Sequence, residues 1–155
     1  IKERFTPEYI QVNCIKNIVN DLFPEKQEGG TLIQKMVESG KKLFILQKLL
    51  PDCGDHLLIG YRKKQMEDCI QHEATIWNFF LQNNLLQSID KNVYRDYVQE
   101  GPKTQELGED APGNIGSFVG WQIVKKYMSI HEELDLTNMM QTDPDEMVRE
   151  AKYKP

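Results

Sequence analysis

The sequence is organised around one stretch near its C-terminal end, Ala111-Pro-Gly-Asn-Ile-Gly-Ser-Phe-Val-Gly-Trp-Gln-Ile-Val-Lys-Lys-Tyr-Met128. If this stretch is helical, its apolar side chains cover most of the circumference instead of one stripe, because they fall at positions 115, 118, 119, 121, 123, 124, 127 and 128. A helix that is apolar nearly all round is buried. The stretch therefore predicts a central, buried helix over about residues 114–129, with the other helices packed around it.

Three glycines, Gly113, Gly116 and Gly120, lie on or near one face of this helix. Glycine inside a helix costs up to about 1 kcal/mol relative to alanine, so something must approach the backbone closely on that face. One occupant is a neighbouring helix. The other is a ligand or peptide bound at Gly113, Asn114 and Gly116, where free N–H groups at a helix N-terminus favour a carboxylate or phosphate.

The rest of the chain also has helical signals. Thr6-Pro7-Glu8 supplies an N-cap, a proline at the first helical position and an acid in the first turn of a helix that ends near Phe23. Thr31 and Gln34 form a capping-box pair that opens a long helix through Leu50. Further helices are expected at Lys63–Leu86, Asp90–Tyr97, Asp135–Gln141 and Asp143–Lys152.

The predicted fold is therefore all-α, with six or seven helices in a single domain over residues 1–155. The helix over Lys63–Leu86 is the longest, and we expect it to be the second main helix of the fold, beside the central one. The segment His56–Tyr61 is too short to assign and is taken as a loop, with a brief extended segment as the other interpretation.

Composition excludes some classes of protein. A chain of 155 residues with 39% hydrophobic side chains can build a core, and its net charge of −5 without a long Lys/Arg cluster argues against binding to nucleic acid. No stretch approaches the roughly 18 to 20 consecutive apolar residues of a membrane-spanning helix. The odd number of cysteines argues against a disulfide framework, and Cys14 and Cys69 are expected to be small buried side chains within helices.

A search for catalytic motifs finds no complete site. His72-Glu73 begins a zinc-protease motif, but the position of its second histidine holds Ile76. His56 and His131 have no partner at metal-ligand spacing, and no nucleophile or phosphate-loop motif occurs. No catalytic residue and no cofactor are therefore assigned from the motifs alone.

One long polar segment remains, Gln99–Pro112, with two prolines, two glycines and four acids. A loop of this length within a compact domain is usually functional or mobile. We expect either a cover over a cleft beside the central helix, with Glu38 on the same side of the domain, or a plain surface connector.

The block 111–128 resembles the C-terminal part of the gliding-motility lipoprotein GldB family of Bacteroidota. Other pieces agree in the same order along the chain: Arg4–Ile10, Met36–Phe44 running to Leu49-Leu50-Pro51, Glu73–Leu86 with its Ile-Trp-Asn-Phe-Phe, and Ala151–Pro155. This resemblance implies the back half of a larger cell-envelope lipoprotein, either periplasmic or in the outer membrane. The front half would carry the signal peptide and the lipid anchor that alone attaches the protein to the membrane.

That family is in turn similar to predicted zincin-type metalloproteases, in which a Glu-Gly pair supplies the third zinc ligand. Gly40 matches the glycine, but Ser39 precedes it; in the other register Glu38 is the ligand and Ser39 replaces the glycine. Two hypotheses follow. The leading one is a non-enzymatic envelope domain for gliding motility or its linked secretion machinery, whose partners are the missing N-terminal portion or other envelope proteins. The alternative is the helical C-terminal half of a zincin-like zinc-dependent peptidase, with Glu38 as metal ligand only if a His-Glu-x-x-His helix lies upstream in the parent protein.

Overall fold

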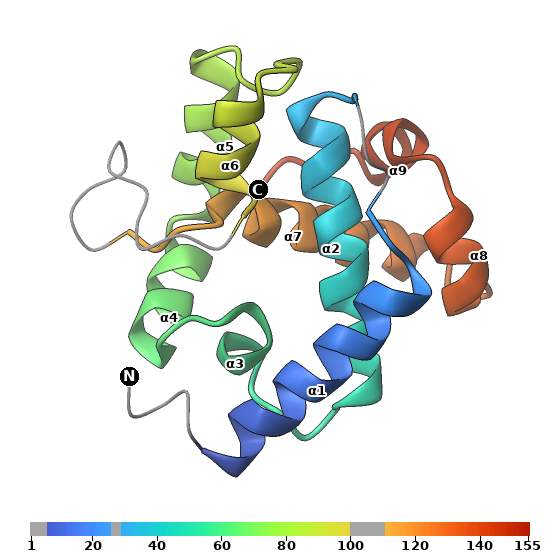
Figure 1. The fold of residues 1–155 in the computed structure, drawn as a ribbon. Coiled ribbons are helices and arrows are strands. Elements are labelled where there is room, and N and C mark those ends of the chain that lie inside the picture. Colours follow the sequence, from blue (N-terminus) through green and yellow to red (C-terminus); the bar gives the residue numbers. More distant parts are fainter. Residues whose placement is uncertain (1–5, 26–28, 100–110) are drawn as a thin grey trace.

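The computed structural model describes residues 6–25, 29–99 and 111–155, and these residues form helices joined by turns, without strands (Figure 1). The helices are α1 (Pro7–Leu22), α2 (Leu32–Leu49), α3 (Asp55–Ile59), α4 (Lys63–Gln71), α5 (Glu73–Gln82), α6 (Lys91–Tyr97), α7 (Ile115–Ile130), α8 (Leu136–Gln141) and α9 (Pro144–Ala151). The all-α class is confirmed. None of the helices within the described ranges is long and apolar enough to cross a lipid bilayer.

Helix α7 is the central helix that the sequence predicts. It runs from Ile115 to Ile130, and Phe118, Val119, Trp121 and Ile123 on it are fully buried. Figure 1 shows α7 passing behind α2 near the middle of the molecule, with the other helices around the pair. The predicted boundaries, about 114–129, agree with the structure to within one residue because the apolar pattern defines the helix locally.

The principal partner of α7 is α2, and glycines bring the two backbones together. A Cβ atom on Gly120 would overlap the Met36 carbonyl, and a Cβ atom on Gly40 would overlap the backbone of Gly120. A Cβ atom on Gly116 would lie 2.7 Å from the Tyr97 carbonyl oxygen. The neighbouring-helix interpretation is thus confirmed at Gly120. The helix that packs most extensively on α7 is therefore α2. The expectation that Lys63–Leu86 would be the second main helix of the fold was wrong.

Two further elements differ from the prediction. Lys63–Leu86 is not one helix, because the chain turns at His72, whose ring Nδ1 lies 2.8 Å from the Asp68 carbonyl oxygen. The segment taken as a loop contains the short helix α3, which Gly60 ends in the left-handed conformation at φ 82°. With these two changes the described residues form nine helices instead of six or seven.

One prediction about the core also fails, on helix α1. Cys69 is buried as expected, but Cys14 is exposed, and so are Ile10, Ile18 and Leu22. Only one side of α1 packs on α2 and α3, through side chains that include Val12 and Val19. Apolar residues occupy more of the circumference of α1 than the neighbouring helices cover.

Candidate functional site

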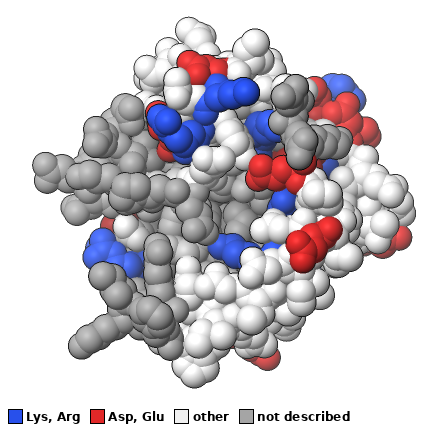
Figure 2. All heavy atoms as spheres, viewed as in Figure 1, with Lys and Arg blue, Asp and Glu red and all other residues white. Residues whose placement is uncertain are grey.

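A cleft of about 790 Å³ lies between the end of α1, one side of α2, the end of α6, the start of α7 and the α8–α9 turn. Figure 2 shows a hollow in the middle of this face, with basic (Lys or Arg) and acidic side chains around it. Its lining includes Glu38, Ser39 and Lys42 from α2, Ser117 from α7 and Asn114, which directly precedes α7. Its volume falls in the range of about 300 to 1,000 Å³ that is common for small-ligand sites.

Lys41, just beneath the cleft, has a fully buried ammonium group. Its Nζ donates to Glu38 Oε1 at 3.0 Å, to the Met140 carbonyl at 3.3 Å and to the Thr142 carbonyl at 2.5 Å. A buried charge is tolerated only when it is paired and hydrogen-bonded. Lys41 therefore attaches the α8–α9 turn to α2 and neutralises Glu38, whose side chain remains 32% exposed in the cleft wall.

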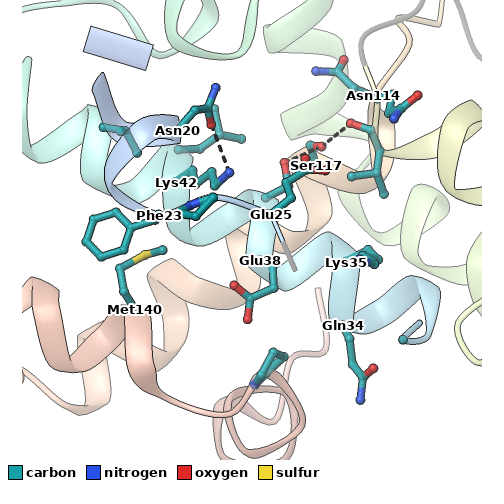
Figure 3. Close-up of a pocket in the computed structure, with 18 of the residues that line it drawn as sticks. Asn20, Phe23, Glu25, Gln34, Lys35, Glu38, Lys42, Asn114, Ser117 and Met140 are labelled. Carbon is teal, nitrogen blue, oxygen red and sulfur yellow. Dashed lines mark hydrogen bonds between the residues drawn. The ribbon is translucent and has the colours of Figure 1, made fainter. Parts of the chain in front are cut away.

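Lys42 follows directly in sequence but points into the cleft (Figure 3). Its Nζ donates to the amide oxygen of Asn20 on α1 at 3.0 Å. Burial lowers the pKa of Lys42 below its usual value of 10.5, and the nearby carboxylates of Glu25 and Glu38 offset part of that shift. No carboxylate of the described residues forms an ion pair with this ammonium group.

Two hydroxyl groups link the elements that meet at the cleft (Figure 3). Ser39 Oγ donates to Ser117 Oγ at 2.8 Å, and Ser117 Oγ donates to the Val98 carbonyl at 2.9 Å. Both hydroxyl protons are therefore committed to oxygen acceptors that are not bases. A catalytic serine needs a general base within hydrogen-bond reach, so this chain of hydroxyls joins α2, α7 and the end of α6 without activating a nucleophile.

Also in the cleft lining, the Tyr94 hydroxyl lies 3.2 Å from both carboxylate oxygens of Glu25 and donates to them. Burial raises the pKa of Tyr94, and the Glu25 carboxylate raises it further. The ammonium group of Lys35 lies 5.5 Å from the centre of the Tyr94 ring. Glu25 thus has a hydrogen-bond partner of its own in the cleft wall.

The structure separates the residues predicted at the helix start. Asn114 lines the cleft in the left-handed conformation, at φ 46°, and its Nδ2 donates to the Ile59 carbonyl at 3.4 Å. Gly113 is buried, with its carbonyl accepting a hydrogen bond from the Tyr61 hydroxyl at 3.0 Å. Gly116 packs against Met36 and Tyr97 and is not among the lining residues.

Glu38 and Asn114 border the same cleft, so the predicted proximity of Glu38 to the start of the central helix is found. The suggested cover over the cleft falls on residues 100–110, outside the described residues. Sequence reasoning missed Lys41 and Lys42. A signal was present, because Lys41 lies four residues after Val37, within the apolar side of α2, where a lysine needs a partner.

The described residues do not by themselves form a zinc site. No histidine or cysteine lines the cleft in the described ranges, and nowhere in them do three His, Cys, Asp or Glu side chains gather as a ligand set. The Lys41 ammonium group already occupies one oxygen of Glu38. Zinc bound at Glu38 would therefore require ligands from outside the described residues and the displacement of this lysine.

Comparison with protein families now adds to this geometry. The family model described as gliding motility protein GldB matches residues 1–155, the full length given. The chain belongs to the GldB family. Membership of this family associates the chain with gliding motility. Because the family is one of lipoproteins, it also associates the chain with the cell envelope. Searches of curated proteins and of solved structures found no significant match to this GldB-family chain.

Proposed function

We propose that this chain is a non-enzymatic, partner-binding domain of a cell-envelope lipoprotein that serves gliding motility or the protein secretion machinery linked to it. The observation that carries the proposal is the family match over residues 1–155. The lipid anchor would belong to the front half of the parent protein, and we expect a bacterium of the Bacteroidota as its source. Partners would be that front half or other envelope proteins.

The geometry of the cleft supports a binding role. Its polar groups are arranged as structural links: Glu38 with Lys41, Ser39 with Ser117, and Glu25 with Tyr94. Together with the bonds of Lys41 to the Met140 and Thr142 carbonyls and of Ser117 to the Val98 carbonyl, these links hold α2, the end of α6, α7 and the α8–α9 turn around a hollow of about 790 Å³. A preformed hollow of this size is suited to recognising a partner.

Gene deletion tests the proposal directly. In the source bacterium, a deletion strain should lose surface spreading, or secretion of the proteins that the linked machinery exports, and a wild-type copy should restore both. Fractionation of the envelope, with detection of the protein in inner- and outer-membrane pellets, would show where it resides. Unchanged spreading, secretion and surface assembly in the deletion strain would contradict the proposed function.

The alternative, the helical C-terminal half of a zincin-like zinc-dependent peptidase, has one observation in its favour, the position of the Glu38 carboxylate in the wall of a cleft. It predicts stoichiometric zinc in the purified full-length protein and loss of that zinc in Glu38→Gln. Metal analysis by mass spectrometry decides the point. Zinc content that is absent, or equal in wild type and Glu38→Gln, removes Glu38 as a ligand.

A further inference from the structure

Two adjacent lysines on α2 differ in how their charge is balanced. Lys41 is fully buried and lies 3.0 Å from the Glu38 carboxylate. Lys42 is half-buried in the cleft, and among the described residues the group that accepts its hydrogen bond is the neutral amide oxygen of Asn20. Burial disfavours this cation, and the nearby Glu25 and Glu38 carboxylates, neither of which forms an ion pair with it, offset only part of that cost. The cleft therefore contains a position where an added carboxylate would be stabilised.

The acidic side chains near Lys42 are already engaged. Glu38 accepts from Lys41, and Glu25 accepts from the Tyr94 hydroxyl. Asp143, also in the lining, accepts from the backbone N–H of Asp145 as the N-cap of α9. Each of these carboxylates has a donor of its own, so a ligand carboxylate at Lys42 would not have to displace a salt bridge. In a chain with net charge −5, this cleft is locally suited to an anion.

The remainder of the lining combines apolar and amide groups. Leu22, Phe23 and Met140 supply apolar surface, and the buried side chains of Val19, Leu43 and Leu46 lie behind it. Asn20 and Asn114 lie among them, and within the described residues Asn20 accepts one hydrogen bond and Asn114 donates one, out of the four that each amide can make. A hydrocarbon chain would cover these amides without bonding to them, which is unfavourable. A peptide backbone offers both donors and acceptors.

We propose that the cleft binds a peptide segment of a partner protein whose aliphatic side chains fill the apolar surface and whose carboxylate pairs with Lys42. The carboxylate belongs to an aspartate, a glutamate or a C-terminus. This inference rests on the proposed function and specifies the chemistry of its partner. A fatty-acid ligand is the occupant that the amide lining disfavours.

Selection from a displayed library of short random peptides tests the inference with the purified protein. Peptides recovered on wild type should carry an acidic residue or a free C-terminal carboxylate beside aliphatic residues. Synthetic copies, measured by calorimetry, should bind Lys42→Met about thirtyfold more weakly, because a close charge pair is lost. Lys48→Met is the matched control, since Lys48 lies on the same helix outside the cleft lining, and it should bind as wild type does.

A second set of binding measurements, with altered peptides, keeps the test valid if Lys42→Met folds poorly. Replacing the acidic residue of the peptide by its amide should weaken binding to wild-type protein by the same factor, and Lys42→Arg should retain part of the affinity. Combining the amide peptide with Lys42→Met should cause no further loss, which identifies the pair as one interaction. Circular dichroism of each variant reports its helical fold.

Three results would overturn the inference: no peptide is selected, the selected peptides bind Lys42→Met as tightly as wild type, or sodium oleate binds and displaces them. These results leave the proposed function standing if the deletion strain still fails to spread or secrete. Conversely, peptide binding that depends on Lys42, together with a deletion strain of normal behaviour, would retain the site and reject the role in motility.

Discussion

Helix α2 has two faces that the fold uses in opposite ways. On one face Met36 and Gly40 meet Gly120 of α7 with backbone against backbone, and no space for a Cβ atom remains. On the other face Glu38 and Lys42, each two residues further along, line a cleft of about 790 Å³. The first face is packed without space for side chains, and the second presents long charged side chains to an open cleft.

The face of α2 that packs on α7 stabilises the domain, whereas the face that lines the cleft is available for binding. Close contact between helix backbones leaves no tolerance for added atoms, because protein interiors are packed as densely as organic crystals. The cleft face has open space beside its side chains, so changes there should alter binding more than folding. Four predictions test this contrast, from the largest expected effect on stability to the smallest.

Gly120→Leu should destabilise the domain most, by about 3 kcal/mol or more, because any side chain at this position overlaps the Met36 carbonyl of α2. Chemical denaturation followed by circular dichroism measures the free energy of unfolding. Ser129→Leu, at an exposed position of the same helix, is the control and should have little effect. A loss below about 1 kcal/mol at Gly120 would show that the contact between α2 and α7 is not tight.

Lys41→Met should destabilise by about 2 kcal/mol, because the Met140 and Thr142 carbonyls lose a charged donor and Glu38 loses its counter-ion. The figure is moderate because Glu38 is partly exposed and water can replace one partner. Glu38→Gln should also destabilise the domain, because the amide oxygen still accepts from Lys41 but the buried ammonium group loses its counter-ion. Equal unfolding free energies for Lys41→Met and wild type would mean that the α8–α9 turn does not depend on this lysine.

Asn114 lines the cleft directly before α7, and its positive φ of 46° is the feature to test. Asn114→Ala should cost about 1 kcal/mol, because alanine is disfavoured in the left-handed conformation. Asn114→Gly should change stability little, since glycine adopts this conformation freely and the lost bond to Ile59 is long, at 3.4 Å. The difference between the two variants in thermal melting isolates the backbone contribution; identical values would contradict it.

Lys42→Met should change the free energy of unfolding by no more than about 0.5 kcal/mol near neutral pH, in contrast to its neighbour Lys41. The pKa of Lys42 is lowered in the folded protein, so between that value and 10.5 the unfolded chain binds more protons and stability rises with pH. Wild type should therefore gain stability relative to Lys42→Met as pH approaches 10.5. A constant difference between the two across this range would show that Lys42 is not desolvated.

Local signals in the sequence were reliable where the structure depends on neighbours along the chain. The Thr6 hydroxyl accepts from the Tyr9 N–H at 3.3 Å, and Thr31 and Gln34 form both bonds of the predicted capping box. Asp143 caps the helix that begins at Pro144. Each of these motifs is complete within four residues, so no distant contact is required to form it.

Predictions failed where the outcome depends on distant segments. The apolar pattern of α1 could not show that α2 and α3 cover only one side of the helix, which leaves Cys14 exposed. The pattern of Lys63–Leu86 was compatible with one helix, yet the chain turns at His72 into α5, which packs on α7. In both cases periodicity identifies an apolar side chain but not the surface that will cover it.

By itself, the sequence determined the all-α class, the starts of the helices that carry capping motifs, the buried helix from Ile115 to Ile130 and the family to which the chain belongs. These properties follow from the order of residues over one or two helical turns, or from similarity along the whole chain. Only the tertiary structure decided that Lys41 is buried against Glu38 while Lys42 points into a cleft with Asn20 and Asn114. Neighbouring residues on a helix point about 100° apart, and the fate of each side chain depends on which helix packs there.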